Sequence, residues 1–510
     1  MEENSDPTDR VESPLREIST WFATVWHIAL CLLCYALFLV ALIPMLPFIA
    51  VFNILRVTER VLVKMTSGQI ALTGIDALGV PCTDENHVII NVLHCFENKG
   101  CLDEAINNFR QAILERLVNA KKADGELVYP RVRWYVRPGR FQYFFQEDQS
   151  FKIENHVFKW EGEVPRSKDE LEAIVSKLNN EPFSAGRSPW YYCCVPTCFG
   201  DNDIAVVFRI KHYVADGISV SKYIAYNFPD QKGFLATPQK FSTTERTLLL
   251  AKGLLLAPMY LFKLILASAD QSILHGPQLC GVKKVAWHKA VELKLIKEIK
   301  TVTGTTVNDV LTSCISLALR RYFQKKGDKH PADFTASVAA DIRLTPASLE
   351  ELSFENKFSF VFPKLPVATE GAEKQLYEAK ARMDKVKFSG DPWASYVVLL
   401  TSHYLFPEFL STKVNSFCMN KASCILSNVP GPQHEVSVKG IRMKSVTFWP
   451  PNFGNIAVTI SICSFDGQVF VGVQGDACVL SDPGVIIEEF GNAVHEMARC
   501  VLRSNGSISN

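Results

Sequence analysis

Residues 21–55 form an uninterrupted stretch without Asp, Glu, Lys or Arg, and no other feature restricts the fold of this chain as strongly. The stretch is longer than the roughly 20 residues that cross a bilayer as one helix. We therefore expect at least part of it to enter a membrane, with a buried core helix as the alternative. Pro44 and Pro47 interrupt the stretch. They allow either one span that ends near Leu42 before an interfacial segment, or a bent hairpin that returns to the same side.

The residues that flank this stretch indicate how it is used. Residues 1–20 are polar and acidic, unlike the basic start of a cleaved signal peptide, so we expect an uncleaved anchor at 21–55. Basic residues follow the stretch more often than they precede it: Arg56, Arg60 and Lys64 against Arg10 and Arg16. Under the positive-inside rule this excess favours a cytosolic body.

Composition limits the class of protein. The 510 residues are 48% hydrophobic and 21% charged, which suits two packed domains with an apolar attachment. A formal net charge of +1 provides no field to attract nucleic acid, so we expect no nucleic-acid partner. The 15 Cys are irregularly spaced, which fits a reduced, cytosol-facing body better than a disulfide framework. Cys31 and Cys34 lie in the apolar stretch without a second ligand pair, and no HExxH pattern occurs, so no metal site is expected.

From about Ser67 to Leu502, strand-like and helix-like segments alternate, which predicts a mixed α/β body. Residues 307–323 have helical periodicity, whereas 204–210 resemble a strand. Residues 233–281 are interpreted as a connector between two halves.

The connector contains a second apolar tract, residues 247–269, which Lys252, Pro258 and Lys263 interrupt. The uncharged part between the lysines is expected to be too short to span a membrane. We expect this tract to lie in the headgroup layer or to cover a lipid tunnel; an ordinary interdomain helix is the alternative.

The segment 204–224 carries the most specific pattern, His-x-x-x-Asp-Gly. An apolar strand is expected to hold His212 at its end, and Asp216-Gly217 to turn the chain into a helix. An imidazole with a pKa near 6.5 can take a proton from an alcohol, as ester synthesis from a thioester requires. A buried or capping His beside an ordinary Asp-Gly turn is the alternative.

This segment resembles the HHxxxDG motif of the CoA-dependent acyltransferase superfamily, with Lys211 in place of the first His. The whole chain resembles the wax ester synthase/diacylglycerol acyltransferase family over about Lys64 to Arg503. Further segments match the family in order, although the Pro-Leu-Trp motif lacks its Leu: Leu72–Ala77, Arg187–Trp190, Val307–Leu311, Ser427–Pro432, Ser464–Gly467 and Asp476–Asp482.

The resemblance implies an α/β fold of two chloramphenicol-acetyltransferase-like domains behind an N-terminal membrane anchor, with a tunnel at the domain interface. The chain is expected to begin with an acidic tail (1–20) and the anchor (21–55). An N-terminal acyltransferase domain (64–232), the connector (233–281), a C-terminal acyltransferase domain (282–503) and a short tail (504–510) follow.

The resemblance also implies roles for individual residues. His212 is the expected base, and Asn308 is expected to donate a hydrogen bond to the developing oxyanion, with a purely helix-starting role as the alternative. Asp216 and Gly217 are expected to support the site. Apart from the resemblance, we expect Arg343 to pair with Asp216, with a solvated surface Arg as the alternative. Two residues are expected to line the tunnel: Ser427 and Asn428.

The predicted enzyme transfers a fatty acyl group from acyl-CoA, a co-substrate, to a long-chain alcohol or diacylglycerol, without any cofactor. Membrane lipid is a further expected partner. We expect the endoplasmic reticulum membrane, with the body facing the cytosol; the lipid droplet and the plasma membrane are alternatives. Two other functions stay open: transfer to a small soluble acceptor, and non-catalytic lipid binding by the same fold.

Overall fold

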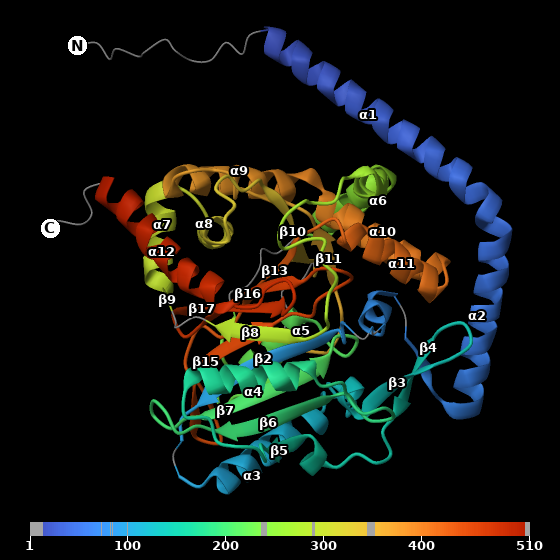
Figure 1. The fold of residues 1–510 in the computed structure, drawn as a ribbon. Helices are drawn as coiled ribbons and strands as arrows, with labels where there is room; N and C mark the ends of the chain where they lie inside the picture. Colours follow the sequence, from blue (N-terminus) through green and yellow to red (C-terminus); the bar gives the residue numbers. More distant parts are fainter. Residues whose placement is uncertain are drawn as a thin grey trace, which may run out of the picture.

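The computed structural model describes residues 14–72, 74–81, 83, 85–98, 100–235, 242–287, 291–343 and 352–504. Two large β-sheets lie one above the other, each with helices on its outer side (Figure 1). A small third sheet joins β1 (Ile70–Ala71), β4 (Tyr143–Glu147) and β3 (Trp134–Pro138). The mixed α/β fold with two domains that was expected from the sequence is therefore confirmed.

The first sheet is built around β7, an apolar strand whose residues are nearly all buried. Its strands pair antiparallel except for β5 and β6. In spatial order they are β14 (Val436–Val438), β15 (Ile441–Trp449), β2 (Ile89–Phe96), β7 (Ile204–Lys211), β6 (Trp190–Pro196) and β5 (Val157–Lys159). Helix α3 (Leu102–Ile113) lies on the outer side, and α4 (Lys168–Asn180) packs against β8 of the second sheet.

The second sheet combines parallel pairing at its centre with antiparallel pairing elsewhere. Its main strands in order are β11 (Phe358–Val361), β10 (Phe334–Asp341), β13 (Cys424–Pro430), β16 (Val458–Phe465), β17 (Gln468–Asp476) and β8 (Lys283–Trp287). Short strands β12 (Lys364–Leu365) and β9 (Val291–Glu292) pair with β10 and β17.

The helices outside the second sheet share its largest apolar cluster. They are α7 (Leu293–Thr303), α8 (Val307–Lys325), α9 (Ala372–Ser389) and α12 (Gly484–Ser504). Helix α8 begins where the sequence predicted a helix, because Thr306 and Asp309 form a capping box at its first turn. Its apolar residues then follow the helical repeat and are buried.

The first sheet contains two strands from beyond the expected domain boundary at residue 282, whereas all strands of the second sheet come from residues 283–476. Strands β14 and β15 come from the C-terminal half, yet β15 pairs with β2 from Met443 opposite Phe96 to Trp449 opposite Asn91. This pairing completes the first sheet with a late segment and ties the two domains together. Local hydrophobic patterns do not reveal such a long-range partner.

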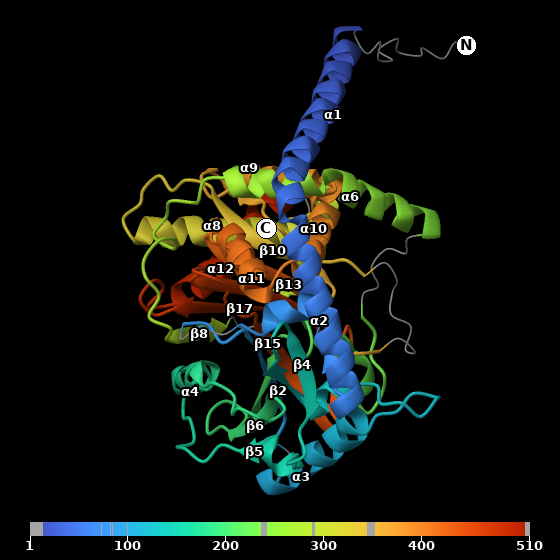
Figure 2. The same ribbon diagram turned by 90° about the vertical axis from the view of Figure 1, so that its right-hand side faces the viewer.

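The apolar N-terminal stretch forms two helices joined by a short bend. Helix α1 (Pro14–Leu42) leads through a 3-10 turn (Ile43–Met45) into α2 (Leu46–Ser67). The pair follows a bent path along one side of the body (Figures 1 and 2). The helix pair does not fold back on itself, so the hairpin alternative was wrong: the prolines lie at the starts of helical segments, where they are tolerated.

Much of this helix pair is exposed although it is apolar. Trp26 is 74% exposed, Val40 70% and Ile54 65%. Residues Val25–Ser67 are long and apolar enough to cross a membrane, by length and composition. The core-helix alternative is not what the structure has, since only 11% of the most apolar window is buried.

Helix α6 (Thr243–Leu266) forms from the second apolar tract. It is continuous through Pro258 and has 24 residues, so by length and composition alone it too could cross a membrane. The expectation that the uncharged part between Lys252 and Lys263 is too short to span stays a prediction. Helix α6 packs on α10 (Asp391–Leu405) and contacts α1.

Candidate active site

His212 follows directly after β7, between the two sheets. Its backbone NH donates to the carbonyl of Val88 at 3.1 Å, which continues the pairing of β7 with β2. The preceding Lys211 donates its Nζ to the carbonyl of His87. Lys211 is not among the residues that line the cavity at His212, so its replacement of the family's first His does not put a cation beside the imidazole.

A cavity opens in front of His212, with an empty volume of about 740 Å³, open mouth included. Both halves of the chain line it, so the site is interdomain. Asp216 and Gly217 line it, and so do Ser427 and Asn428 from the middle of β13. Asn428 is exposed, so the cavity reaches solvent beside it.

Asp216 serves as the N-cap of α5 (Gly217–Lys222) and accepts from the backbone NH of Ser219 at 2.8 Å. Arg343 donates to the same carboxylate at 2.8 Å, and the backbone NH of Lys357 donates at 2.9 Å. Burial alone would raise the pKa of Asp216, but Arg343 and these NH donors outweigh it and hold the pKa below its usual value. The carboxylate is thus saturated with donors and holds the turn after His212 in place.

Gly217 lies where little space is left for a side chain. A Cβ on it would meet Cγ2 of Val429 at 3.3 Å. The first turn of α5 therefore packs closely against β13, which belongs to the other half of the chain.

Aromatic rings surround the imidazole of His212. Its ring centroid lies 5.3 Å from that of Phe358 and 6.2 Å from that of Phe453. Burial among these rings lowers the pKa of His212, and Asp216 opposes that shift without cancelling it. The imidazole is therefore neutral at physiological pH and able to accept a proton.

Three residues that the sequence analysis did not select form a chain behind His212. The side chain of Asn356 lies near the imidazole and raises the pKa of His212, although its Oδ1 has no hydrogen-bond partner within the described residues. Asn356 in turn donates its Nδ2 to Asp76 at 2.8 Å. Arg131 holds Asp76 with two hydrogen bonds of 2.9 and 2.7 Å.

Only one of these three carried a signal in the sequence. Asp76 lies in the segment Leu72–Ala77 that matched the family, whereas Asn356 and Arg131 stand in no selected motif. Their proximity depends on a contact between residues 280 positions apart.

Asn308 lies in the first turn of α8, as the helix-start alternative described. Its Oδ1 accepts from Nδ2 of Asn428 at 3.1 Å. Asn308 itself is not among the residues that line the His212 cavity. The structure thus links Asn308 to the cavity through Asn428, and the oxyanion role predicted for Asn308 stays a prediction.

One group in the described part of the chain brings metal-ligand atoms together: Cys280, Asp476 and Cys478, within 4.8 Å of one another. Lys283 already pairs with Asp476 at 3.1 Å, and the backbone NH groups of Cys280 and Gly281 donate to it. None of these residues lines the His212 cavity. We interpret the group as a structural ion pair at the end of β17.

Comparisons with known proteins place this site in a family. Residues 84–276 match the wax ester synthase/diacylglycerol acyltransferase catalytic domain, and residues 354–498 match the WS/DGAT C-terminal domain. The chain belongs to the wax ester synthase/diacylglycerol acyltransferase family. The enzyme class expected from the sequence, an acyl-CoA-dependent O-acyltransferase, is confirmed at the level of this family.

Named relatives are distant in sequence. A putative diacylglycerol O-acyltransferase of Mycobacterium tuberculosis is 23% identical over 448 residues, covering 76% of this chain and 82% of its own. Wax ester synthase/diacylglycerol acyltransferase 8 of Arabidopsis thaliana is 23% identical over 396 residues, covering 66% of this chain and 80% of its own. The solved wax ester synthase/diacylglycerol acyltransferase from Marinobacter aquaeolei VT8 matches with a TM-score of 0.60 at 18% identity, covering 84% of this chain and 99% of its own. This last likeness confirms the fold.

Proposed function

We propose that this protein is a membrane-bound enzyme that transfers a fatty acyl group from acyl-CoA to a lipid alcohol, either a long-chain alcohol or diacylglycerol. The observation that carries the proposal is the neutral imidazole of His212, which faces an interdomain cavity whose walls are mainly apolar. The family of the chain and the printed names of its relatives support the same reaction.

In the proposed reaction, one imidazole nitrogen of His212 takes the hydroxyl proton as the alcohol oxygen attacks the thioester carbonyl. The C–S bond then breaks, and the proton passes from the imidazolium to the departing CoA thiolate. The products are an ester and free CoA, and the sequence contains no Gly-x-Ser-x-Gly elbow for an acyl-enzyme. We propose that Asn356, which lies near the ring, orients it so that one nitrogen faces the cavity.

The oxyanion of this reaction needs a donor near Ser427 and Asn428. Asn428 lines the cavity and hydrogen-bonds to Asn308, so we propose that the pair acts together, with Asn308 orienting the amide of Asn428. In this arrangement Asn308 is a positioning residue.

The membrane part of the proposal rests on exposed apolar surface. The outward side chains of α1 and α2 form a continuous apolar band that water alone would not accommodate. We propose that this band lies in a bilayer, that of the endoplasmic reticulum, with the body on the cytosolic side as the flanking basic residues favour.

The test is a product analysis with an acceptor panel. Membrane fractions with the wild-type protein receive labelled acyl-CoA and, separately, a fatty alcohol, diacylglycerol or a small soluble alcohol. Labelled wax ester or triacylglycerol supports the proposal. Exclusive use of the soluble acceptor, or acyl-CoA binding without any ester product, contradicts it.

A further inference from the structure

A second cavity lies under α6, α10 and α11 (Glu408–Met419), beside the His212 cavity. Its empty volume, open mouth included, is about 960 Å³. Most of its lining is apolar. Representative lining residues from the three helices are Leu264, Val398, Leu399, Cys418 and Met419.

This cavity and the His212 cavity share two aromatic side chains. Phe360 and Phe453 line both cavities, and their ring centroids lie 5.9 Å apart. Phe453 also packs edge-on against His212. Val88, which lines the second cavity, accepts the backbone hydrogen bond of His212. Rotation of one or two phenylalanine side chains would therefore join the two spaces at the imidazole.

The helices over this cavity also present apolar side chains to the outside. On α6, Leu254 and Leu255 are exposed, and on α11 so are Phe409 and Phe417. The long helix pair α1–α2 runs along this same side of the body (Figure 2).

Specific contacts attach the helix pair α1–α2 to helices α6 and α10. In α1, the Cys31 thiol lies 3.6 Å from the sulfur of Met259. In α2, Arg56 donates to the carbonyl of His403 in α10 at 2.9 Å. The cavity thus lies directly inside the surface that the proposed function assigns to the bilayer.

We propose that this second cavity receives the hydrocarbon chain of the lipid acceptor, which slides in from the bilayer between α6 and α11. Phe360 and Phe453 form the gate through which the hydroxyl end reaches His212. Acyl-CoA, which is charged and water-soluble, uses the solvent opening at Asn428. This inference rests on the proposed function and adds to it a separate site and route for the acceptor.

Variants that fill the cavity test this assignment. Val398→Trp and Thr412→Trp change half-buried lining residues, where a larger ring extends into the empty space. Val302→Trp, on the exposed side of α7 and outside the cavity lining, is the matched control. Each protein is assayed in vesicles with alcohols from hexanol to hexadecanol at fixed acyl-CoA, and with short to long acyl-CoA at fixed hexanol.

Both cavity variants should lose roughly tenfold or more in kcat/KM for hexadecanol, because several methylenes lose their burial, while hexanol turnover stays near wild type. The acyl-CoA series should not change. A loss of kcat/KM confined to long acyl-CoA would show that the cavity binds the acyl chain, and would overturn the assignment. Wild-type kcat/KM of both cavity variants for every alcohol would also overturn it.

A binding measurement separates this inference from the proposed function. Wild-type protein in vesicles is irradiated with a diazirine-bearing hexadecanol, and labelled peptides are identified. Label in α10 and α11, reduced in Val398→Trp but not in Val302→Trp, supports the cavity even if no ester forms. Label restricted to the outer surface of α1 and α2 contradicts it, even if the enzyme is active.

Discussion

Arg343 donates to the carboxylate of Asp216 at 2.8 Å, although the two residues lie 127 positions apart. Their side chains are only 6% and 5% exposed. The pair joins the segment after β10 to the first turn of α5, so it fastens the turn behind His212 to the second domain.

Breaking this pair should destabilise the protein, because a buried charge loses its partner in the other domain, although Arg343 keeps Asp341 at 2.9 Å. We expect Asp216→Ala or Arg343→Ala to lower the free energy of unfolding by about 3–5 kcal/mol. Denaturant unfolding of detergent-solubilised protein measures the change. Lys263→Ala is the matched control: its pair with Asp391 is 64% exposed on the lysine side and should contribute at most about 1 kcal/mol. An equal decrease in the free energy of unfolding for Asp216→Ala and Lys263→Ala would contradict the structural role assigned to Asp216.

Asn356 is expected to act through the orientation of His212. Asn356→Ala should lower kcat by about 100-fold with little change in KM, since a misplaced base hinders the chemical step more than binding. Asn356→Asp would place a carboxylate beside the imidazole and raise the pKa of His212, so the acid limb of the pH–rate profile should move to higher pH. A purely structural Asn356 would lower activity without moving that limb.

The pH dependence of the wild-type enzyme follows from the surroundings of His212. Burial lowers its pKa below the usual 6.5, so the base stays neutral further into the acid range. We expect kcat/KM to rise with pH through a midpoint below 6.5 and then to level off. The stability of the fold should also fall as the pH falls. Between the pKa of His212 in the folded chain and its higher pKa in the unfolded chain, the unfolded chain binds more protons, so acidification through that range favours unfolding. An acid limb centred above 6.5 would contradict this burial.

Charge on the outer face of the helix pair should weaken membrane association. We expect Val40→Glu combined with Ile54→Lys to move protein from the membrane to the soluble fraction, because both side chains are highly exposed and each charge is costly in hydrocarbon. Carbonate extraction and flotation of membranes measure the distribution. The double variant Glu373→Lys/Lys374→Glu in the polar helix α9 is the control, and equal release of both proteins would contradict the proposed face.

Local patterns in the sequence were enough to locate the strand that ends at His212 and the turn at Asp216-Gly217, because alternation and turn chemistry act over a few residues. The apolar stretch at 21–55 predicted a membrane anchor. The structure has an exposed apolar helix pair there, which continues to Ser67. Arg343 was selected as a partner for Asp216 because an arginine suits a carboxylate, with a solvated surface Arg as the alternative.

Other parts depend on contacts between distant segments. Nothing near Asn356 in the sequence indicates that it lies between His212 and Asp76, and nothing near β15 indicates that it pairs with β2. The second cavity is visible only once α6, α10 and α11 are packed together. Such features arise from tertiary packing, which local propensity does not encode.

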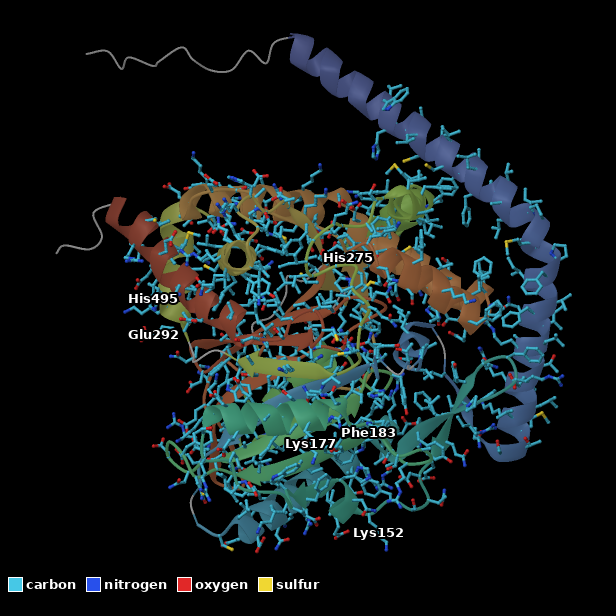
Figure 3. The ribbon with its side chains drawn as sticks, in the orientation of Figure 1. Lys152, Lys177, Phe183, His275, Glu292 and His495 are labelled. Carbon is cyan, nitrogen blue, oxygen red and sulfur yellow. The ribbon has the colours of Figure 1, made fainter. Side chains whose placement is uncertain are left out.

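The most direct test of the central claim is ester synthesis by His212→Ala protein in cells that lack neutral lipid. His495→Ala is the matched control, because His495 is exposed on α12 (Figure 3) and is not among the residues that line the His212 cavity. The account predicts that His212→Ala loses about 100- to 10,000-fold of the activity, the usual contribution of a general base, while His495→Ala keeps it. Wild-type levels of wax ester or triacylglycerol from His212→Ala protein would contradict the account.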